Sequence, residues 1–494
     1  MSVSNNLLAL QVVLPLMAAP LCVLFRQRNV CFLLATLVTW TSLGISLWLA
    51  AQVGEAGAVS YALGGWAAPW GIEYRIDALS AFMLVLVSGV AALALPYARS
   101  SIASEIDADQ HYIFYALFAL CLTGLLGIVV TGDAFNMFVF VEISALSSYV
   151  LIAMGRDRRA LMAAYQYLIM GTIGATFLVI GIGLLYLTTG TLNLVDMAAR
   201  LPAVPEYRPV LAALAFITVG IGLKLALFPL HLWLPNAYTY APSAVSAFLA
   251  ATATKVSVYM LIRFYFSVFG ESLVFERLPL PQIMLVLSLA AMFVASVMAI
   301  YQDNLRRLFA YSSVAQIGYI TLGLSFDSLN GLTASILHLF NHGITKGALF
   351  MLAGAAAARV GGVRLSQLAG LGQRMPLTAF GIVLGGLSLI GVPGTAGFIS
   401  KWYLVLAAIE KGQWWLVMAI LASSLLAVIY VWRFVEVAYF RPPPAGSEAR
   451  CEAGPGLLLP AGLMVAAVIW FGLNTTFTVG TVSAAAARLM GVAP

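Results

Sequence analysis

The stretch that decides the fold lies near the middle of the chain, where residues 210–235 read VLAALAFITVGIGLKLALFPLHLWLP. It begins as an apolar run, and a membrane helix needs roughly 20 mainly apolar residues. The run contains Lys224 and then Pro229, His231 and Pro235. Proline removes a backbone donor, so the helix should break here. Broken backbone at membrane depth is stable only where protein or a water-filled cavity supplies its partners. The stretch therefore predicts an interrupted membrane helix that carries a buried lysine.

The composition of the whole chain agrees with a membrane protein. Of its 494 residues, 62% are hydrophobic and only 9% are charged, whereas a soluble domain has about 25% charged residues. The net charge of +6 comes without a basic run, so nucleic acid is not an expected partner. The cysteines, which show neither metal-ligand nor disulfide spacing, are Cys22, Cys31, Cys121 and Cys451.

Apolar runs recur along the chain at the length of membrane helices. Barrel strands would alternate apolar and polar residues and be about half as long. We therefore expect an all-α integral membrane protein of about 14 transmembrane helices. The predicted spans are 7–25, 30–51, 78–95, 111–131, 134–154, 161–188, 210–228, 244–270, 282–301, 309–326, 330–357, 377–410, 415–440 and 457–474.

The arginines predict the orientation of these spans. With fourteen spans, one side of the membrane collects Arg26, Arg28, Arg99, Arg156, Arg158, Arg159, Arg306, Arg307, Arg359, Arg364, Arg374, Arg441 and Arg450. The other side collects Arg75, Arg200, Arg208, Arg277, Lys411 and Arg488. The richer side should be cytoplasmic, which places both termini outside. Arg263 and Arg433 lie late in spans and are expected to reach the interface by snorkelling.

A second span is also interrupted, because residues 391–397 read GVPGTAG. The two interrupted spans are the seventh and the twelfth, five apart, which predicts two structural repeats with ion sites at the breaks. The predicted units are helices 1–3 (1–100), helices 4–8 (111–270), helices 9–13 (282–440) and helix 14 with the tail (457–494). The alternative is two ordinary proline kinks, which are common in membrane helices.

Four of the five lysines fall within or beside apolar spans, and only Lys411 lies in a loop. A charge at the bilayer centre costs about 2.5–3.5 kcal/mol on insertion scales, so such lysines indicate function. Lysine can lose its proton when desolvated, unlike arginine. Glu142 lies about nine residues into the fifth span with no cation on that span, so we expect it to pair with Lys224. A static ion pair that only fixes helix packing is the alternative.

Further titratable groups lie on the eighth, eleventh and twelfth spans. They are Lys255, then His338, His342 and Lys346, and finally Lys401 after the second break. His338, His342 and Lys346 are spaced by four residues and share one helix face. Histidine titrates near neutral pH and can relay protons. With Glu142 and Lys224, these groups could form a row along the membrane plane.

Less direct interpretations of the same residues remain open. His231 either connects the row to one surface or is a loop residue. One histidine of the eleventh span could be a hydrogen-bonded packing group, with His342 the better candidate. Two histidines at this spacing could bind zinc, but no third ligand or general base accompanies them. Lys401 is either the far end of the row or a snorkelling lysine.

Four segments carry a family resemblance: FVEIS (140–144), KLALFPLHLWLPNAY (224–238), APSAVSAF with TKVSVY (241–248 and 254–259), and NHGITK (341–346). They resemble the antiporter-like subunits of Mrp-type sodium/proton antiporters, respiratory complex I and membrane-bound hydrogenases. The resemblance implies fourteen helices with inverted five-helix repeats. It also implies that Glu142 and Lys224 are a coupled pair, Lys255 a connecting lysine, the eleventh-span residues a central relay, and Lys401 the terminal residue of the second repeat.

The resemblance also implies a setting for the chain. Lysine at position 401 is similar to the D-type subunits of Mrp antiporters or to the complex I subunit nearest the quinone arm, and the style of the motifs is most similar to the D type. We therefore expect one component of a hetero-oligomeric complex in the bacterial or archaeal cell membrane. It would move protons, with sodium as the candidate exchanged ion, and would need no cofactor or redox centre of its own. The alternatives are a proton-pumping component of complex I or a hydrogenase, a self-contained solute transporter in which Lys224 holds a substrate carboxylate, and a membrane enzyme such as a zinc hydrolase.

Overall fold

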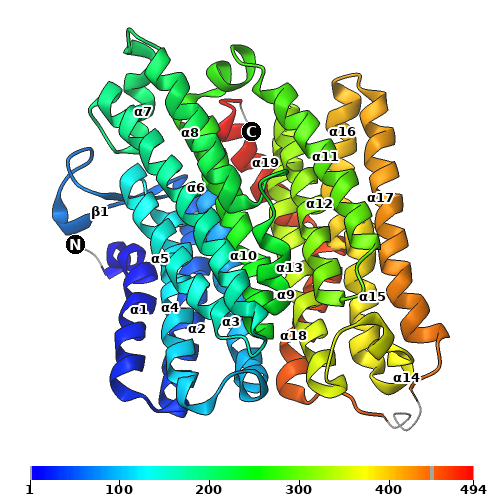
Figure 1. Cartoon of the computed structure of the whole chain (residues 1–494). Helices are drawn as coiled ribbons and strands as arrows, with labels where there is room; N and C mark the ends of the chain where they lie inside the picture. The colour runs from blue at the N-terminus through cyan, green and yellow to red at the C-terminus, as the bar shows by residue number, and fades with distance from the viewer. Residues whose placement is uncertain (1–2, 445–449, 493–494) are drawn as a thin grey trace.

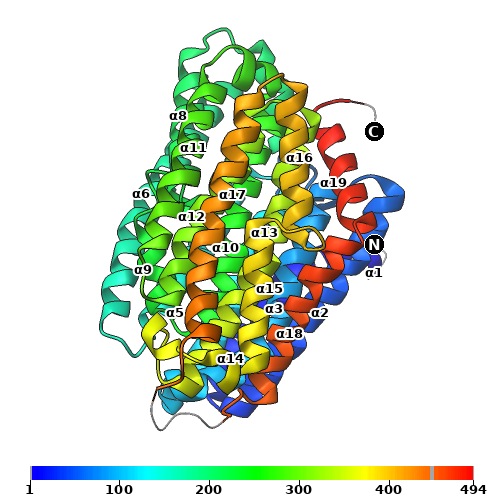
Figure 2. The same cartoon turned by 90° about the vertical axis from the view of Figure 1, so that its right-hand side faces the viewer.

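A computed structural model of the chain describes residues 3–444 and 450–492 as a bundle of long helices (Figures 1 and 2). The first half contains α1 (Val3–Phe25), α2 (Arg28–Ala56), α3 (Ala78–Glu105), α4 (His111–Val130), α5 (Ala134–Ala153), α6 (Arg159–Thr189), α7 (Leu194–Arg200), α8 (Arg208–Leu225), α9 (Trp233–Tyr240) and α10 (Ser243–Ile262). The second half contains α11 (Leu280–Ile300), α12 (Leu305–Ser325), α13 (Leu329–Val360), α14 (Leu371–Arg374), α15 (Pro376–Ile390), α16 (Ala396–Glu410), α17 (Trp414–Val435), α18 (Pro455–Leu473) and α19 (Thr476–Leu489).

Each predicted span coincides with one of these helices or with a broken pair of them. In the described part of the chain, eleven helices are long and apolar enough to cross a membrane. The helices α12, α13 and the pair α15–α16 are outside that set. The chain is an all-α membrane protein, and the number fourteen stays a prediction. Some short elements were not predicted: a hairpin of β1 (Val59–Ala62) and β2 (Glu73–Ile76), and also α7 and α19.

Both predicted interruptions are present. The first separates α8 from α9, and Ala226 directly after α8 adopts a left-handed conformation with φ of 61°. The indole of Trp233 donates to the carbonyl oxygen of Leu223 at 2.9 Å, so the break satisfies one of its own free acceptors. The second separates α15 from α16, where Gly391 has φ of 90°, a conformation that favours glycine.

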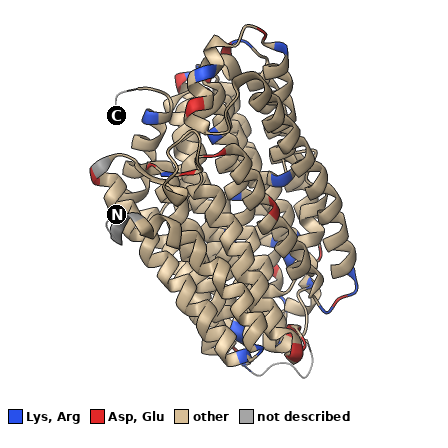
Figure 3. Cartoon of the chain, turned by 90° about the vertical axis from the view of Figure 1, so that its left-hand side faces the viewer, with Lys and Arg blue, Asp and Glu red and all other residues tan. Residues whose placement is uncertain are grey.

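The helix α13 lies in the interior, where it packs against α3, α10, α12, α15, α16 and α18. From Gly331 to Ala356 every one of its residues is buried. A helix surrounded by protein can carry polar side chains on several faces, which explains why its composition falls short of a lipid-facing span. Most charged residues lie toward the two ends of the bundle, and a few lie inside it (Figure 3).

Candidate functional site

The predicted pair of Glu142 and Lys224 forms. Glu142 lies on α5, and Lys224 lies in the last turn of α8, directly before the first break. The Lys224 Nζ lies 3.6 Å from the Glu142 Oε1. Lys224 is only 6% exposed. The helix break positions the lysine, because the C-terminal end of a helix carries partial negative charge that favours a cation.

No hydrogen bond joins the two charged groups of this pair. At 3.6 Å the two groups attract without a hydrogen bond, and neither atom has a hydrogen-bond partner among the described residues. At an effective dielectric constant of about 20, the Coulomb attraction at this distance is roughly 4–5 kcal/mol. Neutralising one partner would therefore leave the other as a buried charge without this attraction.

Lys255 lies on α10 and is 1% exposed. Its ammonium donates to the carbonyl oxygen of Ala250 and, at 3.3 Å, to the Thr254 Oγ1. A cavity of about 20 Å³ lies between α10 and the first pair, and it is lined by Lys224, Ser257 and Ser144 among others. This volume suits about one water molecule, so the gap between Lys224 and α10 is narrow and partly polar.

The three residues of the α13 face are all buried, and they have different partners. His338 interacts through its Nδ1 with the Ser400 Oγ at 2.7 Å and through its Nε2 with the Gln316 Oε1 at 2.8 Å. Neither ring nitrogen of His342 has a partner among the described residues. The expectation that His342 is the hydrogen-bonded packing group is therefore wrong, because α12 and α16 place their polar side chains around His338 instead.

The rings of His338 and His342 stack with their centroids 5.9 Å apart. Lys346, one turn further along α13, donates to the Phe309 carbonyl oxygen at 2.7 Å and to the Ser312 hydroxyl. Lys255 and this face belong to α10 and α13, which pack directly against each other. The tertiary structure thus brings the α10 lysine and the α13 face together.

Lys401 lies on α16 directly after the second break and does not snorkel. Its ammonium donates at 2.9 Å to the carbonyl oxygens of Leu389 and Ile390, the last residues of α15, and at 2.9 Å to the Ser424 Oγ. The same ammonium lies 4.4 Å from the centre of the Tyr319 ring, and the centroid of that ring lies 5.9 Å from that of the His338 ring. Lys401 is therefore joined to the central group as well as to the break.

His231 lies in the first break, between α8 and α9, and is buried. Its ring stacks on Phe228 with 5.2 Å between centroids. In the described residues it makes no hydrogen bond or ion pair to another candidate side chain, and the expectation that it connects the row to one surface stays a prediction. In the same part of the chain, no group of three or more His, Cys, Asp or Glu side chains is placed to hold a metal ion.

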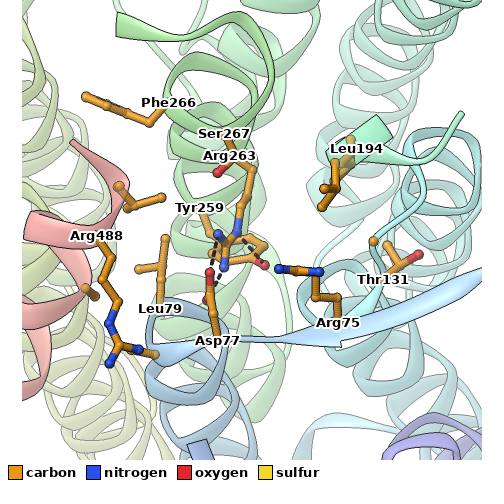
Figure 4. Close-up of a pocket in the computed structure, with 15 residues that line it drawn as sticks. Arg75, Asp77, Leu79, Thr131, Leu194, Tyr259, Arg263, Phe266, Ser267 and Arg488 are labelled. Atoms are coloured by element: carbon orange, nitrogen blue, oxygen red, sulfur yellow. Dashed lines mark hydrogen bonds and ion pairs between the residues drawn. The ribbon is translucent and has the colours of Figure 1, made fainter. Parts of the chain in front are cut away.

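A pocket lined by arginines lies at the C-terminal end of α10, and the sequence did not predict it. Arg263 was expected to snorkel, but its guanidinium is buried and binds Asp77, which caps α3 (Figure 4). The guanidinium also donates to the hydroxyl of Tyr259 at 3.0 Å. A pocket of about 260 Å³ opens beside this pair, with Arg75 and Arg488 on either side. Tyr259 follows Lys255 by four residues on one face of α10, and Arg263 follows four residues later, directly after the end of that helix.

Two further ion pairs join distant segments. Arg306 of α12 binds Glu105 at the end of α3, at 3.4 Å, and its guanidinium also donates to Ser243 of α10. Arg433, in the last turn of α17, binds Asp303 at 3.0 Å and donates to the Gln302 carbonyl oxygen. The Asp303 side chain is 84% exposed, so Arg433 reaches the surface of the bundle as a snorkelling arginine does. The partners in these pairs lie far apart in the sequence, so no local sequence pattern predicts that they meet.

Known proteins share this arrangement of sequence and fold. The family model described as "NADH:quinone oxidoreductase/Mrp antiporter, TM" matches residues 131–427. The chain belongs to this family. It is 44% identical over 82% of its length to the N subunit of the NADH-quinone oxidoreductase of Desulforudis audaxviator, covering 81% of that protein.

Two similarities span nearly the whole chain. It is 30% identical to the D subunit of the Na(+)/H(+) antiporter of Alkalihalophilus pseudofirmus, covering 95% of this chain and 94% of that protein. Its structure matches a chain of the Mrp complex from Dietzia sp. with a TM-score of 0.90 and 27% identity, covering 99% of this chain and 98% of that one. The family resemblance predicted from the four sequence segments is confirmed.

Proposed function

We propose that this chain is the proton-translocating, antiporter-like component of a multi-subunit complex in the cell membrane, equivalent to the D subunit of Mrp sodium/proton antiporters. The observation that carries the proposal is the buried Glu142–Lys224 pair at the first helix break. It stands at one end of a proposed row that continues through Lys255 and the α13 face to Lys401 at the second break. The antiporter relatives, whose alignments span nearly the whole chain, support this choice.

The mechanism follows from the charges. While Glu142 is ionised it favours a protonated Lys224 across 3.6 Å. When Glu142 is protonated or moves away, roughly 4–5 kcal/mol of attraction is lost, and the desolvated lysine releases its proton. Lys255 and His342 are the next acceptors, and His338 passes the charge toward Lys401. The carbonyl oxygens at the end of α15 receive the ammonium there.

A second candidate is the corresponding proton-pumping component of a complex I-type oxidoreductase, favoured by the 44% identity to an N subunit of that class. Electron transfer would then belong to partner proteins. Purifying the complex from its native membrane and identifying its subunits separates the two: hydrophilic redox proteins indicate the oxidoreductase, and their absence indicates the antiporter. A self-contained solute transporter predicts instead saturable uptake by this chain alone.

The test of the row uses Lys224→Ala and Glu142→Gln in the assembled complex. Each variant should lose at least about tenfold in sodium- and pH-dependent proton movement, because the charge that the partner responds to is gone. The matched control is Lys411→Ala, which removes the one lysine in a loop and should keep normal transport. Normal transport in both row variants, with normal assembly, would refute the coupled pair.

A further inference from the structure

A second arginine-rich pocket lies at the opposite end of the bundle from the pocket in Figure 4, and the row does not use it. Its volume is about 500 Å³. It is lined by the turn between α5 and α6, the start of α10, the turn between α11 and α12, and Arg364 after α13. Five arginines contribute to it: Arg156, Arg159, Arg306, Arg307 and Arg364.

The carboxylates of the pocket leave part of this positive charge uncompensated. Asp157 binds Arg159 at 2.6 Å, Glu105 binds Arg306 at 3.4 Å, and Asp303 binds Arg433. In the described residues, Arg307 and Arg364 have no carboxylate oxygen within 4.0 Å. Arg156 pairs with Asp107 at 3.9 Å, and both side chains are exposed. Within the described chain, two guanidinium groups thus lack a carboxylate partner, and the pair of Arg156 is long and exposed.

Two buried donors also lack a partner. The Nε atoms of Arg306 and Arg307 are buried and make no hydrogen bond within the described chain. Arg306 as a whole is 8% exposed. Buried N–H groups of guanidinium are normally hydrogen-bonded, and the guanidinium fork matches the oxygens of a phosphate group. The pocket therefore has the chemistry of a phosphate site.

The surfaces on both sides of the pocket are apolar. The first turns of α6 expose Leu161, Met162 and Tyr165, and the last turns of α11 expose Val297, Met298 and Tyr301. The short helix α9 packs against both α6 and α12, and α6, α9 and α11 follow one edge of the molecule in Figure 2. A phosphate group in the pocket would thus have exposed apolar helix faces running away from it into the membrane.

We propose that this pocket binds the headgroup of an anionic phospholipid, with its acyl chains along the exposed faces of α6 and α11. The pocket lies on the arginine-rich side predicted to face the cytoplasm, which corresponds to the inner leaflet. Residues of both predicted repeats meet in it, so a bound lipid ties the α5–α6 turn to the α11–α12 turn. This site is separate from the proposed proton row and does not depend on it.

The experiment is native mass spectrometry of the delipidated, purified protein, or of the complex that contains it, titrated with phosphatidylglycerol or phosphatidylcholine. Phosphatidylglycerol should bind on the order of tenfold more tightly. Arg307→Gln combined with Arg364→Gln should remove this preference, and Arg306 is left intact because it holds Glu105. The matched control is Arg26→Gln with Arg28→Gln, which removes two exposed arginines from the same predicted side and should change nothing.

Three results would overturn the proposal. They are equal binding of the two lipids, equal loss in the control pair, and displacement of phosphatidylglycerol by inorganic phosphate or glycerol phosphate at millimolar concentration, which would indicate a soluble anion site. If the double variant unfolds at a lower temperature than the control pair, Arg156→Gln replaces it. Because that side chain is 64% exposed, its loss should weaken phosphatidylglycerol binding without changing the thermal midpoint.

Discussion

His338 and His342 share one face of α13, but their surroundings give them different roles. His338 is held at both ring nitrogens by Ser400 and Gln316, and His342 is not held by any described residue. His338→Gln should therefore lower the free energy of unfolding by about 1–3 kcal/mol, because buried partners lose their hydrogen bonds. His342→Gln should cost less than His338→Gln, because no described partner of His342 loses a hydrogen bond, although both should slow proton movement.

The two histidine variants are compared by denaturant unfolding in detergent and by proton uptake in proteoliposomes. The informative result is a loss of unfolding free energy in the His338 variant but not in the His342 variant, with slower proton uptake in both. A His342 variant with full transport would remove that residue from the proposed row, and a His338 variant with unchanged stability would contradict its assigned hydrogen bonds.

Asp77 illustrates how one residue outside the spans serves two elements. It caps α3 by accepting from the Ser80 backbone N–H at 3.0 Å, and it binds the Arg263 guanidinium. Burial raises the pKa of the Asp77 carboxyl, but the charge and hydrogen bonds of Arg263 more than offset this and lower the pKa to about 2. The usual value is about 3.9, so the pair stabilises the fold above about pH 4 and loses this effect as the pH falls toward 2.

We expect Asp77→Asn to lower the free energy of unfolding by about 2 kcal/mol at pH 7. The variant should also lose the part of the acid dependence that lies between pH 4 and pH 2. Unfolding curves in detergent at several pH values measure both effects. The matched control is Asp157→Asn, which breaks an exposed pair with Arg159 and should change stability by less than about 1 kcal/mol.

At the scale of elements, the second helix break depends on two glycines that differ in one respect. Gly391 and Gly394 both have positive φ, of 90° and 86°. A Cβ on Gly391 would lie 2.8 Å from the Lys401 Cδ, whereas one on Gly394 would have only the Leu473 side chain at 4.0 Å. Alanine strains the backbone at either position by about 1–2 kcal/mol. Only at position 391 does the added Cβ also displace the Lys401 side chain.

Gly391→Ala should therefore reduce proton movement by roughly tenfold, since small displacements of reacting groups are costly. Gly394→Ala should lower the free energy of unfolding by a similar amount and leave proton transport nearly normal. Transport assays and unfolding midpoints on both variants test this. Equal transport loss in both would mean that the break as a whole matters, and not the position of the Lys401 ammonium.

At the scale of the whole molecule, the arginine distribution predicts the orientation of the bundle. Arg156 and Arg277 are both exposed and belong to opposite sides of the predicted topology. Arg156→Cys and Arg277→Cys, each in a background without the four natural cysteines, should react with an impermeant maleimide from the inside and from the outside, respectively. The reverse pattern would invert the orientation, and labelling of both from one side would contradict the number of spans between them.

The helices, the two breaks and the family could all be predicted from the amino-acid sequence. These features depend on local properties: apolar length decides a span, and proline or glycine decides where it is interrupted. The candidate residues could also be identified from the sequence, because a lysine or a glutamate inside an apolar run is rare. The Glu142–Lys224 pairing was predicted because Glu142 had no cation on its own span.

Which of these residues meet depends on the packing of the helices and is known only from the three-dimensional structure. The hydrogen bonds of His338, the carbonyl oxygens around Lys401, the Asp77–Arg263 pair and the arginine pocket all join segments far apart in sequence. In a membrane helix a polar residue gains a partner by packing against other helices, and apolar periodicity does not record which helices those are. For that reason the expected snorkelling of Arg263 was wrong, since its guanidinium is buried against Asp77.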